Sequence, residues 1–162
     1  MAKGVNKIPE IIKEMKDWRG IKGKVGVLGD GEMATIAAVQ EFGTRIKVTD
    51  AMRGYLGSQG LHLKKETSHI VIPERSYLRS TMDDQKTADA MTDSMKQAMD
   101  KNFDGRKAIS AMCATAVGRI QRKINSGVAP ALSDFTKQQK GSGVSLNDTG
   151  RLKQSITYEV VG

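Results

Sequence analysis

The stretch "SYLRSTMDDQKTADAMTDSMKQAMDKNFDGRKAISAMCATAVGRIQRKINSG", residues 76–127, decides the fold that the sequence predicts. Two largely apolar stripes run through it at steps of three and four residues, the spacing that lines one face of a helix. We expect a long helix after an N-cap at Ser76, a break at Asp104-Gly105, and a second long helix, antiparallel to the first if the break is a turn. The stripes are Leu78, Met82, Gln85, Ala88, Met91, Met95, Ala98, Met99 and Phe103, and then Ile109, Met112, Cys113, Ala116, Val117, Ile120 and Ile124.

Upstream of this stretch the sequence predicts a helix, a strand and a second helix. Apolar residues at helical spacing indicate the first helix over residues 8–18, and "KVGVLG" at 24–29 is typical of a short strand closed by a turn. The second helix is expected to begin at an N-cap Thr35 and to end at Gly43, with Phe42 in the core.

The segment between this helix and residue 76 is predicted as a weakly ordered region followed by a hairpin. Residues 44–60 indicate no more than one helical turn, begun by Thr49 or Asp50. The sequence "LHLKKETSHIVI" then predicts a β-hairpin over residues 61–72, two strands joined by a polar turn.

The C-terminal part is predicted as a long loop followed by a strand. Residues 127–147 are rich in Pro, Gly, Ser, Lys and Gln, which is typical of a mobile surface loop. Ile156, Tyr158 and Val160 then alternate with polar residues, the pattern of a half-buried strand. We therefore expect one domain over residues 1–162 of the α+β class, with a small, mainly antiparallel sheet covered by two long helices and shorter ones.

Composition limits the possible environments of the chain. It has 162 residues, a formal net charge of +8 and a single cysteine, Cys113, so its stability does not depend on an internal disulfide. No apolar run suits a signal peptide or a membrane span, which predicts synthesis in the cytoplasm and no membrane partner. The positive charge favours contact with nucleic acid or with an acidic protein surface.

Residues that carry chemistry are sparse. His62 and His69 flank the predicted hairpin turn without a third metal ligand, and Cys113 lies on an apolar helix stripe, which favours a buried thiol. "GVLGDGE" lacks the Lys-Ser/Thr of a phosphate-binding loop and is interpreted as a turn, and Asp83-Asp84 is interpreted as the acidic start of a helix. We therefore expect no enzyme, no cofactor and no metal site.

Two sets of side chains could bind a partner protein or DNA. The methionine stripe at 82, 91, 95 and 99 suits a core face better than a partner groove. Basic residues at 119, 122 and 123, and others near the C-terminus, lack the interleaved aromatics of a base-stacking surface. They are interpreted as solvated or phosphate-facing side chains, so non-specific contact with DNA stays open.

Three motifs in a fixed order resemble one family. They are "AAVQEFGT" at 37–44, "IPERSYLRSTMDD" at 72–84 and "LNDTGRLKQSITYEV" at 146–160. Together they resemble the virion-morphogenesis and tail-completion proteins of the tailed-phage head–tail neck, from about Val25 onward. One departure is Ser76, where many relatives have a second proline before the aromatic residue.

The resemblance implies a structural protein of the virion, without catalytic or cofactor residues. It implies a ring, with six subunits, at the head-proximal end of the tail. The ring joins the tail tube or tail terminator protein to the head-completion proteins, with genomic DNA passing through its lumen. Two rival functions are a tail terminator or other tail-tube-associated protein, and a stand-alone DNA-binding module.

Six residues are candidates for contacts with another subunit or with a partner protein. For two of them a partner inside the chain is the alternative. Arg75 either pairs with Glu74 or meets a neighbouring subunit's carboxylate, and Arg151 either pairs with a carboxylate of its own subunit or contacts its neighbour. The loop over residues 127–147 is the expected partner contact. The candidates are Glu41, Arg75, Lys137, Lys140, Arg151 and Lys153.

Overall fold

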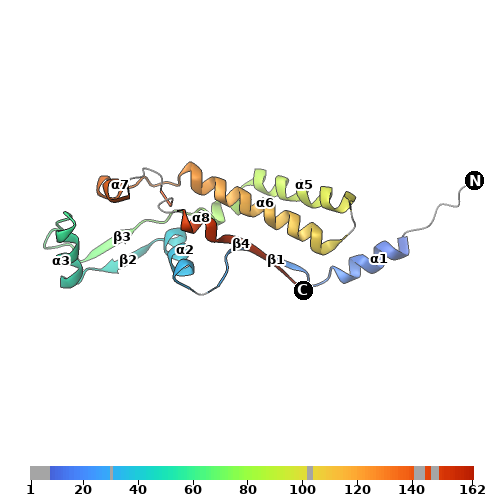
Figure 1. Ribbon diagram of the computed structural model, residues 1–162, viewed down its shortest axis with the longest axis horizontal. Coiled ribbons are helices and arrows are strands. Elements are labelled where there is room, and N and C mark those ends of the chain that lie inside the picture. The colour runs from blue at the N-terminus through green and yellow to red at the C-terminus, as the bar shows by residue number, and fades with distance from the viewer. Residues whose placement is uncertain (1–7, 30, 102–103, 141–144, 147–149) are drawn as a thin grey trace, which may run out of the picture.

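The computed structural model describes residues 8–29, 31–101, 104–140, 145–146 and 150–162. The molecule is elongated, with α1 and α3 at opposite ends of its long axis (Figure 1). Its elements in chain order are α1 (Ile8–Asp17), β1 (Lys22–Val27), α2 (Glu32–Phe42), β2 (Thr44–Lys47), α3 (Asp50–Ser58), β3 (His69–Ile72), α4 (Arg79–Met82), α5 (Gln85–Lys101), α6 (Gly105–Ser126), α7 (Asp134–Lys140), α8 (Arg151–Ser155) and β4 (Ile156–Val161). The expected α+β class is confirmed.

The two long helices form the body of the molecule together with one strand pair. α5 and α6 lie side by side, and α6 packs on the antiparallel pair β1–β4 (Figure 1). The register runs from Lys22 opposite Val161 to Val27 opposite Ile156, so the predicted last strand is confirmed. α6 begins where the sequence predicts a break, because the side chain of Asp104 caps it by accepting a hydrogen bond from the Lys107 N–H at 3.1 Å.

The first predicted long helix is interrupted. A short α4 precedes α5, and Asp83 and Asp84 lie between them. The Asp84 carboxylate accepts hydrogen bonds from the N–H and the hydroxyl of Thr87, at 3.0 and 3.1 Å. An acidic side chain that satisfies the open N–H groups of a helix start ends the preceding turn and begins a new helix.

The hairpin predicted over residues 61–72 is wrong in its pairing. Its second half is β3, as expected, but β3 pairs antiparallel with β2, from Thr44 opposite Ile72 to Lys47 opposite His69. Residues 61–64 have no regular structure. The guanidinium of Arg53 donates hydrogen bonds to the carbonyl oxygens of Leu63, Lys64 and Thr67, which holds this connection against α3.

Two expectations for the segment before β3 also change. The N-cap of α2 is Gly31, four residues before the predicted cap Thr35, so the helix begins at Glu32. The side chain of Phe42, expected in the core, is 61% exposed. Thr49 caps α3 as one of the two predicted starts, since its side chain accepts from the Met52 N–H at 3.2 Å, but the helix runs to Ser58 rather than for one turn.

The predicted loop over residues 127–147 contains ordered parts. α7 lies within it, and Leu146 is a buried core residue. Ser145 closes the loop at its base, since its hydroxyl accepts from the Val128 N–H at 2.8 Å and donates to the Val128 carbonyl at 2.6 Å. Asp148 and Thr149 of the third motif lie outside the described residues.

The core brings the three sequence motifs together. Its buried members come from the first motif (Ala37), the second (Tyr77), the third (Leu146, Leu152 and Ile156) and from α6 (Ile120 and Ile124). The thiol of Cys113 is buried, as expected, and burial raises its pKa. Within the described residues, no helix combines the length and the apolar character needed to cross a bilayer.

Candidate functional site

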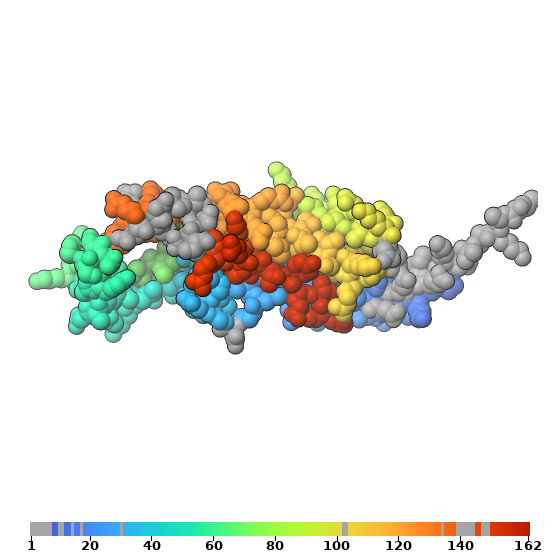
Figure 2. All heavy atoms as spheres, viewed as in Figure 1, coloured from blue at the N-terminus to red at the C-terminus, as the bar shows by residue number. Residues whose placement is uncertain are grey.

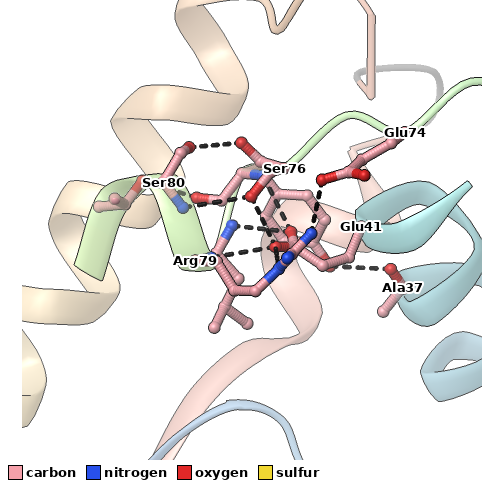
Figure 3. A network of polar contacts seen from close by, with 9 residues as sticks. Ala37, Glu41, Glu74, Ser76, Arg79 and Ser80 are labelled. Atoms are coloured by element: carbon pink, nitrogen blue, oxygen red, sulfur yellow. Dashed lines mark hydrogen bonds and ion pairs between the residues drawn. The ribbon is translucent and has the colours of Figure 1, made fainter. Parts of the chain in front are cut away.

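The first two motifs meet at a single carboxylate, that of Glu41 (Figure 3). Glu41 lies in the last turn of α2 and is 5% exposed. The segment 74–79, which leads from β3 into α4, wraps around it. We call Glu41, Gly43 and residues 74–79 the Glu41 junction.

Five donors converge on the Glu41 carboxylate. Oε1 accepts from the Ser76 hydroxyl at 2.8 Å, and from the backbone N–H and the Nε of Arg79 at 3.0 and 3.1 Å. Oε2 accepts from the N–H groups of Tyr77 and Leu78, both at 2.9 Å. These N–H groups lie at and just before the start of α4, where no helical carbonyl is available, so Glu41 caps that helix from another element.

The electrostatics of Glu41 follow from these contacts. Burial acts to raise its pKa, but the hydrogen bonds from Leu78, Arg79, Ser76 and Tyr77 stabilise the ionised form and leave the pKa below its ordinary value. The neighbouring hydroxyl of Tyr77 has a pKa raised to about 12, first by burial and second by the charge of Glu41. The junction therefore holds an anion as a structural part of the fold.

Arg79 connects the junction to the surface. Its side chain is half-exposed and forms ion pairs with Glu41 at 3.1 Å and with Glu74 at 2.5 Å. Its guanidinium also lies over the ring of the exposed Phe42, 4.8 Å from the ring centre. Sequence reasoning missed Arg79, although it stands one helical turn after Arg75 in the second motif.

Gly43 lets the two segments come into backbone contact. Its φ of 69° lies in the region that favours glycine, and an added Cβ would stand 2.7 Å from the Glu74 nitrogen and 2.8 Å from the Ile72 oxygen. The Arg75 N–H donates to the Gln40 carbonyl at 2.9 Å, which satisfies one of the last carbonyls of α2.

Arg75 itself does not have the partner that the sequence suggested. It is 7% exposed, and its Nε donates to the Pro130 carbonyl at 3.0 Å, while Glu74 pairs with Arg79 instead. Arg75 thus ties the residues after α6 to the Glu41 junction. Glu41 and Arg75, both candidates for contacts with another subunit, are buried and bond within their own chain.

The other predicted contact residues lie apart from the junction. Lys137 is exposed on α7, and Lys140 is the last residue of that helix. Arg151 is exposed on α8, whereas Lys153 is half-buried and its carbonyl accepts from the Gln121 amide at 3.2 Å. The structure therefore does not bring these four cations together with Glu41 and Arg75 into one site.

A second region contrasts with the buried Glu41 junction, because its residues are exposed or half-buried. Residues 44–72, here called the arm, comprise β2, α3, the connection held by Arg53, and β3, and they form one end of the molecule (Figures 1 and 2). None of the arm residues is buried. Tyr55 and Val71 are 65% and 62% exposed.

A second exposed apolar set lies on α1, at the other end of the long axis (Figure 1). Ile8, Ile12 and Met15 follow the helical spacing predicted for one face, and all three are exposed. The predicted amphipathic face therefore exists, but these three side chains lie outside the core of the chain.

Metal-ligating side chains are not clustered in the part of the chain that the structure describes. No group of three or more His, Cys, Asp or Glu side chains there suits a metal ion. The Nδ1 of His69 contacts the Ser68 hydroxyl at 3.0 Å, and His62 lies beside Gly57. No protein-family model, curated protein or solved structure matches this chain.

Proposed function

We propose that this chain is a structural subunit of the neck of a tailed-phage virion, where copies of it form a ring that joins the tail to the head-completion proteins. The partners are other copies of the chain, six to a ring, the tail tube or tail terminator protein, and the head-completion proteins. Genomic DNA passes through the lumen without sequence-specific contact. The protein is made in the host cytoplasm and ends in the virion.

The observation that carries this proposal is the arm. A two-stranded ribbon with a helix at its tip is marginal alone in water, since it has no apolar interior. The arm buries none of its residues, yet it exposes Tyr55 and Val71. An extension of this kind is typical of a subunit whose remaining apolar contacts come from a neighbour.

The two exposed ends suit a closed ring. Head-to-tail contacts require two different, complementary surfaces on each subunit, and they close into a ring when the rotation between subunits permits. The arm and the apolar face of α1 are two such surfaces, and they lie at opposite ends of an elongated chain (Figure 1). Contact between the α1 face of one copy and the arm of the next leaves the body free for axial partners.

The three motifs support the neck assignment from a separate direction. The order of the motifs has a physical counterpart here, because all three contribute to one core and the first two also meet at the Glu41 junction. The rival neck role, a tail terminator, places the same ring one step further down the tail.

The proposal is tested by the oligomeric state of the chain, alone and on tails. We expect ring-shaped particles in electron micrographs and a ring mass by light scattering, either for the free protein or after mixing with purified tails. The double variant Tyr55→Glu, Val71→Lys is expected to keep the circular dichroism of the parent and to lose the ring, because both side chains are exposed in the single chain.

The matched control changes exposed positions outside both ends, with Lys96→Glu and Lys86→Glu on α5, and is expected to keep the ring. A protein that stays monomeric with tails and with head-completion proteins, and that binds DNA tightly with a steep salt dependence, contradicts the neck proposal and favours a DNA-binding module.

A further inference from the structure

A pocket of about 380 Å³ opens between the start of α5 and the C-terminal half of α6, and neither Glu41 nor a residue of the arm lines it. One wall is formed by α4 and the first residues around the start of α5, and the other by about two turns of α6. The lining residues are Ser80, Thr81, Asp84, Thr87, Arg119, Arg122, Lys123 and Ser126.

Three of the lining residues are cations on one face of α6. Arg119, Arg122 and Lys123 stand three and four positions apart, which brings their side chains to the same side of a helix. Among the described residues none of them forms an ion pair. Asp84 is the one carboxylate among the described lining residues, and it already accepts from the N–H and hydroxyl of Thr87, so the described lining has an excess of positive charge.

One donor in this pocket has no acceptor. The Nε of Arg119 is buried and makes no hydrogen bond within the described part of the chain. A buried donor without a partner destabilises a fold, and such atoms in native proteins call for an explanation such as a bound ion. Arg122 differs, since its Nε donates to the Gly118 carbonyl at 3.2 Å.

The hydroxyl groups that line the pocket already donate hydrogen bonds to acceptors of their own chain. Thr81 donates to the Tyr77 carbonyl, Thr87 to Asp84, and Ser126 to the Lys123 carbonyl. Ser80 donates to the Ser76 carbonyl. The donors left for a ligand are therefore those of the guanidinium and ammonium groups, and the ligand that suits them is an oxyanion that accepts hydrogen bonds in several directions.

We propose that this pocket binds a phosphate group. A phosphate carries a charge of about −1.5 to −2 near neutral pH and several acceptor oxygens, which matches two guanidinium forks and one ammonium better than a single carboxylate does. Any hydroxyl of the phosphate donates to the hydroxyl oxygens or to Asp84. The source is free phosphate or a phosphate of a nucleic acid strand, and the proposal does not depend on ring assembly.

The test titrates inorganic phosphate into the protein in chloride buffer at constant ionic strength, with calorimetry and thermal unfolding as readouts. We expect saturable binding and a rise of the melting temperature. The double variant Arg119→Gln, Arg122→Gln is expected to bind at least ten times more weakly. The matched control Lys96→Gln removes an exposed cation roughly 18 Å along α5 from Asp84, and it is expected to bind like the parent.

Two competition experiments identify the source of the bound phosphate group. If an oligonucleotide without terminal phosphates displaces inorganic phosphate in the parent, the source includes the nucleic acid backbone; if it does not, the site takes the free ion. Equal phosphate binding by the parent and the Arg119, Arg122 variant overturns the proposal, as does binding of neither inorganic phosphate nor the oligonucleotide. Displacement by glutamate at the same concentration as phosphate also overturns it, in favour of a carboxylate partner.

The Arg119→Met variant separates loss of phosphate binding from loss of stability. Since the Arg119 Nε has no partner among the described residues, its replacement is expected to leave the melting temperature in phosphate-free buffer unchanged or raised. The same variant is expected to lose most of the increase in melting temperature on adding phosphate. A variant that melts lower without phosphate and keeps the full increase contradicts the site.

Discussion

In the body of the molecule, Glu41 is 5% exposed and five donors meet its carboxylate; in the arm, Tyr55 is 65% exposed and none of residues 44–72 is buried. The two strands of the arm both lead into the Glu41 junction: β2 follows Gly43 directly, and β3 leads into residues 74–79. The junction is thus the point at which a satisfied polar core changes into an extension that lacks a core.

This difference separates two kinds of stability. The junction stabilises the single chain, because every oxygen of a buried carboxylate is used by its own backbone and side chains. The arm is held by strand hydrogen bonds and by the Arg53 contacts, and its apolar side chains contribute little until they are covered. Substitutions in the junction should therefore change unfolding, whereas substitutions in the arm should change association.

The largest effect is expected for Glu41→Gln. The amide keeps the shape of the side chain but turns an NH₂ group toward donors that need an acceptor, so two or three donors lose their partner. We expect a loss of about 4 kcal/mol in the free energy of unfolding, measured by urea denaturation. The matched control Glu74→Gln removes the exposed partner of the same Arg79 and should cost less than about 1 kcal/mol. Equal effects of the two variants would show that the junction is not a buried anion site.

The next largest effect is expected for Gly43→Ala. The new Cβ meets the Glu74 nitrogen and the Ile72 oxygen in a backbone conformation that suits glycine, and the same denaturation should show a loss of about 3 kcal/mol. Its control lies in the arm: Gly54 is inside α3 with open space around it, so Gly54→Ala should stabilise by about 0.5 kcal/mol or more. A neutral Gly43→Ala would contradict the close approach of the two motifs.

The smallest effect is a pH dependence. Because the pKa of Glu41 is lowered in the folded chain, the unfolded chain takes up the proton first as the pH falls. The stabilisation by Glu41 is complete above its unfolded pKa of about 4.3 and is lost as the pH falls through the folded value. The stability difference between the parent and Glu41→Gln should therefore shrink below about pH 4, in denaturation series at fixed salt. A difference that stays constant down to pH 2 would contradict the lowered pKa.

Much of the body could be predicted from local pattern. The apolar stripes at helical spacing predicted α1, α5 and α6, and alternation predicted β4. In α5, α6 and β4 the predicted face packs inside the chain, whereas the apolar face of α1 is exposed. Thr49 was one of the two predicted starts of α3, and Asp104 stands at the predicted break before α6; the side chain of each caps the helix that follows. These features depend on residues close in sequence.

The failures share a physical cause, since each depends on contacts between distant segments. β2 has only Ile46 among polar neighbours, so nothing local marked it as the partner of β3. Phe42 has the spacing of a core residue, but the helix turns it outward under Arg79. Glu41 looked like a surface acid, because its five donors lie 35 to 38 positions further along the chain.

The reciprocal hydrogen bonds between Ser145 and Val128 have a practical consequence for protein engineering. They fasten both ends of the segment that carries α7, and Arg75 adds a third fastening at Pro130. The length of chain between such anchors does not alter the anchors themselves, since a longer closed loop costs only about 0.6 kcal/mol per doubling. An affinity tag or a fluorescent label is therefore best inserted after Lys140, where it leaves the helical body and the arm intact.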